Sequence, residues 1–261
     1  MSSNWDFYFC QVSDHPASIF VDLDLEREAP ISHLKFMAYV KLRMNAPRPD
    51  GLSSNEEFET LNAIEDALTA DITKDDAALF VGRVTSAGWR QFFFYASEVS
   101  DWGERVGQFA AKHPTYTFDS GSREDPDWQS YFDFLRPSPV DRQRIENRRV
   151  CLMLQKHGDR LAKEREIDHT ALFPTQEARL AFVERAAKLG YRLKQVIDVD
   201  QPKPGYRVEL SRLDVPNLKT IDGITLPLYR LAKELGGAYD GWGTTVIGEV
   251  KGMSVPGAVP K

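Results

Sequence analysis

The chain repeats one order of predicted elements, strand, helix, strand, strand, helix, strand, in each of its two halves. Short runs with apolar residues at every second position predict the strands, and longer runs with apolar residues three or four apart predict the helices. This order is that of the split βαβ, or ferredoxin-like, arrangement. We therefore predict an α+β protein of two tandem ferredoxin-like (βαββαβ) α/β sandwich domains with antiparallel sheets.

The first half begins with two strands that would extend its sheet. Residues 34–44 then alternate apolar and polar side chains, which predicts a half-buried strand. Ser54 and Glu57 have the spacing of a capping box, so a helix is expected to start there. The other predicted elements are strands at 5–12, 18–25, 78–84, 90–96 and 116–119 and a helix after Asp101.

The second half repeats the order behind one additional helix. Pro227 predicts that the last helix starts just before it, because a proline inside a helix removes a hydrogen bond. Gly190 is expected to end the helix before it in a left-handed conformation. The predicted elements are helices at 141–157, 174–189 and around 224–235 and strands at 166–172, 191–199, 206–213 and 239–247, with a turn at 201–205.

Residues 120–140 are rich in turn-forming and charged residues and are predicted to be a linker. We expect one domain at 1–136, a second at 137–247 and a loose tail at 248–261. A group of aromatic side chains within this segment, just before its end at Arg136-Pro137-Ser138-Pro139, is expected to form a plug between the domains, since their exposure to water is unfavourable. Its members are Trp128, Tyr131, Phe132 and Phe134.

The overall composition is that of a globular protein, since 42% hydrophobic residues supply enough apolar material for real cores. Met1 to Phe9 lacks a signal peptide, and no window contains the roughly 18 apolar residues of a membrane span. Cys10 and Cys151 are far apart, which indicates reduced thiols. We therefore expect a cytoplasmic protein.

The charge is divided unevenly along the chain. Residues 1–140 hold 12 Lys and Arg against 23 Asp and Glu, a net −11, whereas residues 141–261 hold 21 against 16, a net +5. The two halves could dock on each other, or present surfaces to different partners, or differ only through drift in solvated charge. The acidic half should repel nucleic acid and the basic half has no run of Lys or Arg, so no direct contact with nucleic acid is expected.

Motifs for metal or cofactor binding are missing from the sequence. The five histidines are scattered, neither cysteine belongs to a Cys-x-x-Cys motif, and no glycine-rich phosphate loop occurs. We expect no cofactor and no metal ion.

A few acidic residues leave a hydrolase open as an alternative. Asp168 and His169 are adjacent, but neighbours on a strand point to opposite faces and cannot form a dyad directly. Two carboxylate pairs spaced i, i+2 could bind a cation or serve in hydrolysis, or form the solvated face of an edge strand. They are Asp22 with Asp24 and Asp198 with Asp200. We assign no catalytic residue and expect a binding protein rather than an enzyme.

The string Tyr239-Asp240-Gly241-Trp242 is the most distinctive in the chain. The Asp-Gly step allows a tight turn or a β-bulge, and the flanking aromatic residues could anchor it or form a recognition surface. The candidate binding residues are Tyr239, Asp240, Trp242, Asp168 and His169.

Four segments of the second half resemble the RraB-like family, the regulators of ribonuclease E activity B. They are Leu154 to Asp159, Glu164 to His169, Gly190-Tyr191 and Gly236 to Trp242, and the resemblance covers about residues 145–247. It implies a ferredoxin-like sandwich that binds and inhibits ribonuclease E without catalysis. We therefore expect a regulatory protein with a protein partner, ribonuclease E or another protein of RNA turnover. The alternatives are a small-molecule sensor or a hydrolase with its site between the domains.

The first half is similar to the domain of unknown function 695 family. The similarity lies in Pro16 to Ile19, Asp50 to Leu52, Ile64 to Asp66 and Val81 to Thr85. This family often precedes an RraB-like domain in bacterial proteins, and the similarity implies no activity.

Overall fold

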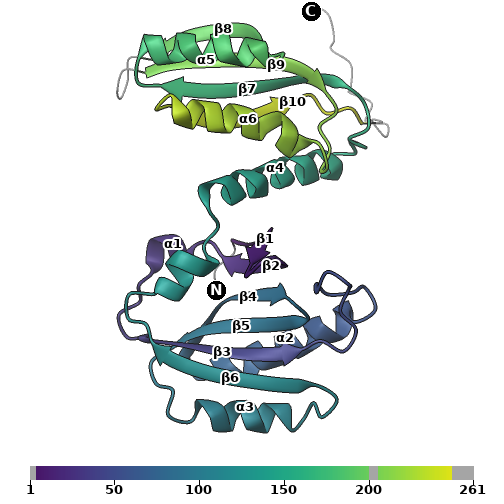
Figure 1. Ribbon diagram of the computed structural model, residues 1–261, viewed down its shortest axis with the longest axis vertical. Coiled ribbons are helices and arrows are strands. Elements are labelled where there is room, and N and C mark those ends of the chain that lie inside the picture. Colours follow the sequence, from purple (N-terminus) through teal and green to yellow (C-terminus); the bar gives the residue numbers. More distant parts are fainter. Residues whose placement is uncertain (1–3, 200–204, 249–261) are drawn as a thin grey trace, which may run out of the picture. The chain divides into compact units, whose positions relative to one another are not determined.

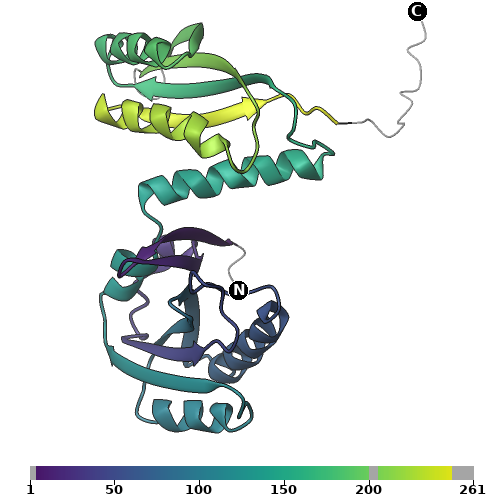
Figure 2. The same ribbon diagram turned by 45° about the vertical axis from the view of Figure 1, so that its right-hand side comes forward.

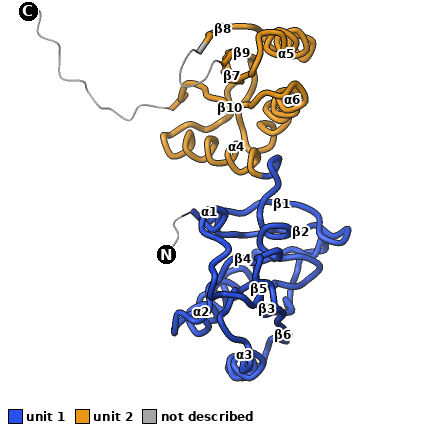
Figure 3. The backbone as a smooth tube through the Cα atoms, turned by 90° about the vertical axis from the view of Figure 1, so that its left-hand side faces the viewer, with its two compact units in different colours: residues 1–141 blue, residues 142–261 orange. Residues whose placement is uncertain are grey.

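The computed structural model describes residues 4–199 and 205–248, so the predicted turn at 201–205 and the predicted tail lie almost wholly outside the described residues. The chain divides into two compact units, unit 1 with residues 1–141 and unit 2 with residues 142–261 (Figure 3). In the described ranges, no helix has the length and apolar character needed to cross a membrane.

Unit 1 is built on a six-stranded antiparallel sheet in the order β1-β2-β4-β5-β3-β6 (Figure 1). Its strands are β1 (Trp5–Val12), β2 (His15–Asp22), β3 (Phe36–Arg43), β4 (Ala78–Ser86), β5 (Trp89–Ala96) and β6 (Thr117–Glu124). Its helices are α1 (Leu25–Glu28), α2 (Phe58–Thr73), α3 (Trp102–Ala110) and the π-helix η1 (Ser130–Leu135). The predicted ferredoxin-like arrangement is confirmed in β4-β5-β3-β6, and the β1–β2 hairpin extends that sheet as expected.

The main core of unit 1 lies between this sheet and helices α2 and α3. Alternate side chains of β3 and β5 point to this face because successive strand residues face opposite sides. They meet the apolar stripe of α2, whose spacing of three and four residues was evident in the sequence. The fully buried members include Val40, Leu42, Phe92, Phe94, Leu61 and Leu68.

The start of α2 uses only half of the predicted capping box. The backbone N–H of Glu57 donates to the hydroxyl of Ser54 at 3.3 Å. The Glu57 carboxylate does not return to Ser54 but accepts from the backbone N–H groups of Asn45 at 2.8 Å and Ala46 at 2.9 Å. Glu57 therefore ties the start of α2 to the segment that follows β3.

The second face of the same sheet is closed by the segment after β6. Trp128 is fully buried, stacks on Tyr95 with ring centroids 3.8 Å apart, and donates its indole N–H to the carbonyl of Leu34 at 2.9 Å. The hydroxyl of Tyr131 donates to the carbonyl of Asp22 at 2.7 Å. The predicted plug between domains is therefore wrong for Trp128 and Tyr131, because these rings belong to the core of unit 1.

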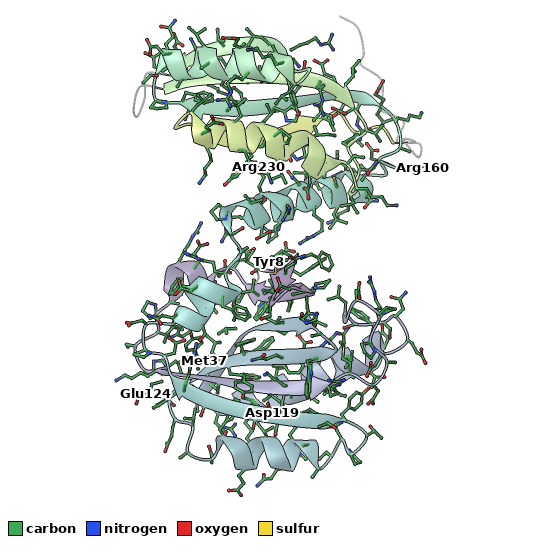
Figure 4. The ribbon with its side chains drawn as sticks, viewed as in Figure 1. Tyr8, Met37, Asp119, Glu124, Arg160 and Arg230 are labelled. Carbon is green, nitrogen blue, oxygen red and sulfur yellow. The ribbon has the colours of Figure 1, made fainter. Side chains whose placement is uncertain are left out.

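The β1–β2 hairpin lies at one end of the curved sheet and β6 at the other (Figure 2). Ile19 and Val21 of β2 are buried, and Tyr8 of β1, labelled in Figure 4, donates its hydroxyl to the carbonyl of Leu135 at 3.0 Å. Burial raises the pKa of Tyr8. Much of the predicted linker therefore has regular structure. Strand β6 extends to Glu124, and η1 binds the β1–β2 hairpin through the hydrogen bond from Tyr8 to Leu135.

Unit 2 is built on a four-stranded antiparallel sheet in the order β10-β7-β9-β8, which confirms the predicted arrangement a second time. Its strands are β7 (Arg165–Phe173), β8 (Arg192–Val199), β9 (Gly205–Asp214) and β10 (Ala238–Thr244). Its helices are α4 (Pro139–Lys156), which starts before the division between the units, α5 (Gln176–Lys188) and α6 (Ile221–Glu234). Figure 3 shows α5 and α6 on the same side of the sheet.

Two local predictions for the helices of unit 2 have different outcomes. Gly190, with a φ of +87°, follows the end of α5 in the expected left-handed conformation. The expectation that α6 starts just before Pro227 is wrong, because the helix begins earlier, at Ile221, and contains Pro227 in its interior. Pro227 has no N–H to bond the carbonyl of Gly223, but the buried apolar stripe of α6 outweighs that loss.

A candidate binding face on the second sheet

The string from Tyr239 to Trp242 lies on β10, at one edge of the sheet of unit 2. Tyr239 pairs with Ala171 and Gly241 pairs with Thr170, so Asp240 is an additional residue without a partner of its own in the ladder. Gly241 has a φ of +105°, a conformation that favours glycine. The Asp-Gly step therefore forms a β-bulge, one of the two conformations that the sequence allowed.

The bulge turns both aromatic side chains of this string toward the helices. In a regular strand, residues three apart face opposite sides of the sheet. Here Tyr239 packs on the core beneath α5 and α6, and Trp242, which pairs with His169, packs on the cluster that includes Ile167. The two rings anchor the edge strand on the helix side.

His169 forms the centre of a buried polar group on this side. Its Nδ1 shares a hydrogen bond of 2.8 Å with the hydroxyl of Tyr239, and the ring of Tyr191 packs edge-on at 5.3 Å. Burial, and then the positive charge of Arg212, lower the pKa of His169 to about 3. Its Nε2 has no hydrogen-bond partner among the described residues. At neutral pH His169 is an uncharged core residue.

Asn147 of α4, which the sequence analysis missed, connects Trp242 to the helices. The side-chain oxygen of this fully buried residue accepts from Trp242 Nε1 at 3.1 Å and from Gln143 Nε2 at 3.0 Å. Its amide nitrogen donates to Asp222 at 2.8 Å and to Thr225 at 2.7 Å. All four hydrogen-bonding positions of the amide are therefore used, which fixes α4, α6 and β10 together.

Asp168 lies on the opposite face of the sheet from His169, as the alternation along β7 predicts. Its carboxylate is 2.8 Å from the ammonium group of Lys194, which also lies 3.6 Å from Glu166. No described helix covers this side (Figure 3). Asp168 and His169 are therefore separated by the sheet and do not form an acid–base pair.

We call this helix-free side of the second sheet the open face. It carries both signs of charge and two exposed leucines. Gly241 and Gly243 of β10 have no side chains, so the backbone of this edge is bare. The side chains of the open face used below are Glu166, Asp168, Leu172, Lys194, Arg207, Glu209 and Leu213.

The predicted carboxylate pairs do not form a common site. Asp22 and Asp24 were expected on one face of a strand, but Asp24 lies beyond the end of β2. The carboxylate of Asp22 accepts the backbone N–H of Asp24 at 3.0 Å. Asp198 pairs with Arg179 at 2.6 Å, and Asp200 lies outside the described residues. Within residues 4–199 and 205–248, no three His, Cys, Asp or Glu side chains are placed to hold a metal ion.

Comparison with known proteins adds two family matches. Residues 3–136 match the model of a family of unknown function (DUF695), and residues 144–244 match the model of the regulator of ribonuclease activity B (RraB). Nothing among the curated proteins matches the chain.

Two solved structures are similar only at a low level. An unknown protein from Galdieria sulphuraria has 11% identity, a TM-score of 0.22 and coverage of 79% of this chain and 96% of its own. A putative glycine cleavage system transcriptional repressor has 8% identity, a TM-score of 0.25 and coverage of 81% and 98%. At such scores neither similarity supports an argument about fold or function.

Proposed function

Because this chain belongs to the family of unknown function DUF695 through residues 3–136, and because residues 144–244 match the regulator of ribonuclease activity B, we propose that it is a regulatory protein whose second unit binds a ribonuclease. Both resemblances inferred from the sequence are confirmed by these matches. The RraB match carries the proposal, since it runs from α4 to the end of β10 and so includes the whole sheet of unit 2.

The open face is the surface that we propose for the partner. Residues on a solvated sheet face are usually polar, whereas Leu172 and Leu213 both expose their side chains here. Around them, Glu166, Asp168 and Lys194 supply charges of both signs. Exposed apolar groups within a polar surround are typical of protein–protein contacts.

The candidate residues divide into two roles in this proposal. Asp168 and Asp240 reach solvent and would contact the partner directly. Tyr239, Trp242 and His169 lie on the helix side, so they would act by fixing the bulged edge strand rather than by touching the partner.

A hydrolase has less support than a binding protein. Asp168 and His169 lie on opposite faces of the sheet, and the imidazole of His169 is buried with a pKa of about 3. A general base needs access to substrate and a pKa near the working pH. His169 meets neither condition.

The proposal is tested with purified ribonuclease E, the partner that the family resemblance implies. We expect the full chain to bind it and to slow its cleavage of RNA. Leu213→Glu on the open face should weaken binding roughly tenfold or more, because it replaces an exposed apolar side chain of the proposed contact with a charge. Leu180→Glu is the matched control, since Leu180 is 56% exposed on α5 and Leu213 is 52% exposed on β9.

Two results would count against different parts of the proposal. If the wild-type chain neither binds nor slows ribonuclease E, that enzyme is not the partner. If binding occurs but Leu213→Glu and Leu180→Glu bind equally well, the partner uses a surface other than the open face.

A further inference from the structure

The ribonuclease proposal concerns unit 2 alone. Unit 1 has a candidate site of its own on the helix-facing side of its sheet. The pairings of Phe9 with Ser18, of Ser18 with Thr85 and of Thr85 with Arg90 place these four side chains in one row across β1, β2, β4 and β5. Among the described residues, the cluster of buried side chains beneath α2 and α3 includes none from β1 or β2. All four side chains of this row line a cleft at the edge of that core.

The cleft is a cavity of about 310 Å³ between this row and the segment that leads into α2. Arg48, Ser53 and Phe58 line it from that segment, and Arg83 and Arg90 line it from the sheet. A volume of this size lies at the lower end of the range for small-molecule sites.

Two guanidinium groups at the base of the cleft share one carboxylate. Both Arg83 and Arg90 pair with Glu65, with Arg90 Nη1 at 3.2 Å. Arg90 is only 1% exposed and also donates to Asn62 at 3.0 Å and Ser53 at 3.2 Å. Among these three partners only Glu65 is charged, and the carboxylate of Glu57 also acts on Arg90 electrostatically.

Arg90 retains an unsatisfied donor. Within the described part of the chain its Nε has no hydrogen-bond partner, and a buried N–H without an acceptor is unfavourable. Burial, and then the charge of Arg83, lower the pKa of Arg90 to about 10, while the carboxylates of Glu65 and Glu57 act in the opposite direction. An anion in the cleft beside Arg83 and Arg90 would give these two guanidinium groups an acceptor in addition to Glu65.

The mouth of the cleft is aromatic. Phe9 is 57% exposed and Phe58 is 43% exposed, and both line the cavity. Large exposed rings beside buried cations fit a ligand with an apolar body and an anionic end. A carboxylate is the anion chosen for the proposal, because its two oxygens match the fork of a guanidinium.

We propose that this cleft binds a small organic carboxylate, whose charged end reaches Arg83 and Arg90 and whose apolar or aromatic body lies against Phe9 and Phe58. The site lies wholly in unit 1 and does not depend on ribonuclease binding. It assigns a ligand-binding role to the DUF695 portion of the chain.

The test is an NMR titration of the full chain with 4-phenylbutyrate, with its uncharged amide 4-phenylbutyramide, and with inorganic phosphate. We expect 4-phenylbutyrate to shift the backbone signals of Ser53, Thr85 and Arg90. The amide should bind roughly tenfold or more weakly, because it lacks the charge-assisted hydrogen bonds. Equal affinity for acid and amide, a preference for phosphate, or an absence of shifts in the cleft up to millimolar concentration would overturn the proposal.

Two substitutions locate the binding. Arg83→Gln keeps the pair of Arg90 with Glu65 and should lower the affinity for 4-phenylbutyrate roughly tenfold. Phe58→Ala changes an exposed ring outside the core and should lower it severalfold. Arg27→Gln on α1 is the control and should bind as the wild type does. If Arg83→Gln and Phe58→Ala, both shown to be folded by thermal melts, keep the wild-type affinity, the cleft is not the site.

Discussion

Strands β4-β5-β3-β6 of unit 1 have the same order as the four strands of unit 2, but the two sheets differ in what covers their second face. In unit 1, helices cover one face and the segment with Trp128 and Tyr131 closes the other. In unit 2, the helices α5 and α6 cover one face, and no described helix covers the open face. The shared order of four strands thus occurs once in a sheet whose two faces are covered by its own chain and once in a sheet with a face that no described helix covers.

The central strands explain this difference. Strand β5 of unit 1 contains four consecutive aromatic residues, Phe92 to Tyr95, which are all buried, so both of its faces must be covered. Strand β7 of unit 2 alternates buried with partly or fully exposed residues along its whole length. Only one face of such a strand needs cover. The apolar pattern of a central strand therefore indicates whether the second face is closed.

The largest expected effect is the loss of the ring that closes the second face of unit 1. Trp128→Ala should lower the free energy of unfolding of unit 1 by about 3–5 kcal/mol, because it leaves a cavity beside Tyr95 and an unpaired carbonyl at Leu34. Urea unfolding measures this. The control is Phe134→Ala, at a partly exposed ring of the same segment. Equal destabilisation by the two substitutions would contradict the enclosed second face.

A smaller effect is expected from the polar group that fixes the helices of unit 2. Asn147→Ala should destabilise this unit by about 2–4 kcal/mol, because it leaves Trp242 Nε1, Asp222 and Thr225 without a shared partner. Gln143→Ala, which removes one peripheral hydrogen bond to Asn147, should have a much weaker effect. Denaturant unfolding of the two variants beside the wild type distinguishes these outcomes, and equal losses would contradict the central role of Asn147.

The pH dependence of unit 2 should show the burial of His169. Its pKa is about 3 in the folded state and about 6.5 in the unfolded state, so below pH 6.5 protons bind to the unfolded chain first. The contribution of the buried, neutral His169 to the free energy of unfolding of unit 2 is therefore fully present above pH 6.5 and is lost as the pH falls. Between pH 7 and 5 the wild type should lose about 2 kcal/mol more than His169→Gln. Urea unfolding at a series of pH values measures the free energy of unfolding of both proteins. If that free energy changes with pH equally in the wild type and in His169→Gln, His169 is not buried as described.

The smallest effect is expected on the open face itself. Leu213→Ala should change the free energy of unfolding by less than about 1 kcal/mol, since half of this side chain is in water. Its comparison is Leu210→Ala on the same strand, where the side chain faces the helices and is 1% exposed. Thermal melts of both variants measure the contrast. A loss at Leu213 that equals the loss at Leu210 would mean that the open face is part of a core.

The sequence predicts the order of elements and both sheets because the apolar periods of two and of 3.6 residues are clear in most segments. It fails where a tertiary contact overrides a local rule. Pro227 lies inside α6 because the apolar stripe of that helix is buried on both sides of the proline. Trp128 and Tyr131 belong to unit 1 because their partners, Tyr95 and Asp22, lie far away in the sequence.

The candidate sites were predictable to different degrees. The Asp240-Gly241 bulge follows from its residue types, and the separation of Asp168 from His169 follows from strand alternation. Asn147 left a signal, since it precedes Cys151 and Leu154 at the spacing of one buried helix face. The cleft of unit 1 left almost none, because strands and loops that are distant in the sequence form it.

The most direct test of the open face is lysine footprinting of the full chain, with and without ribonuclease E, by acetylation and mass spectrometry. Lys194 lies on the open face, whereas Lys188 lies on α5 and Lys233 on α6. We predict that the bound ribonuclease protects Lys194 and leaves Lys188 and Lys233 as reactive as in the free chain. Protection of Lys188 or Lys233 with unchanged reactivity of Lys194 would contradict the account.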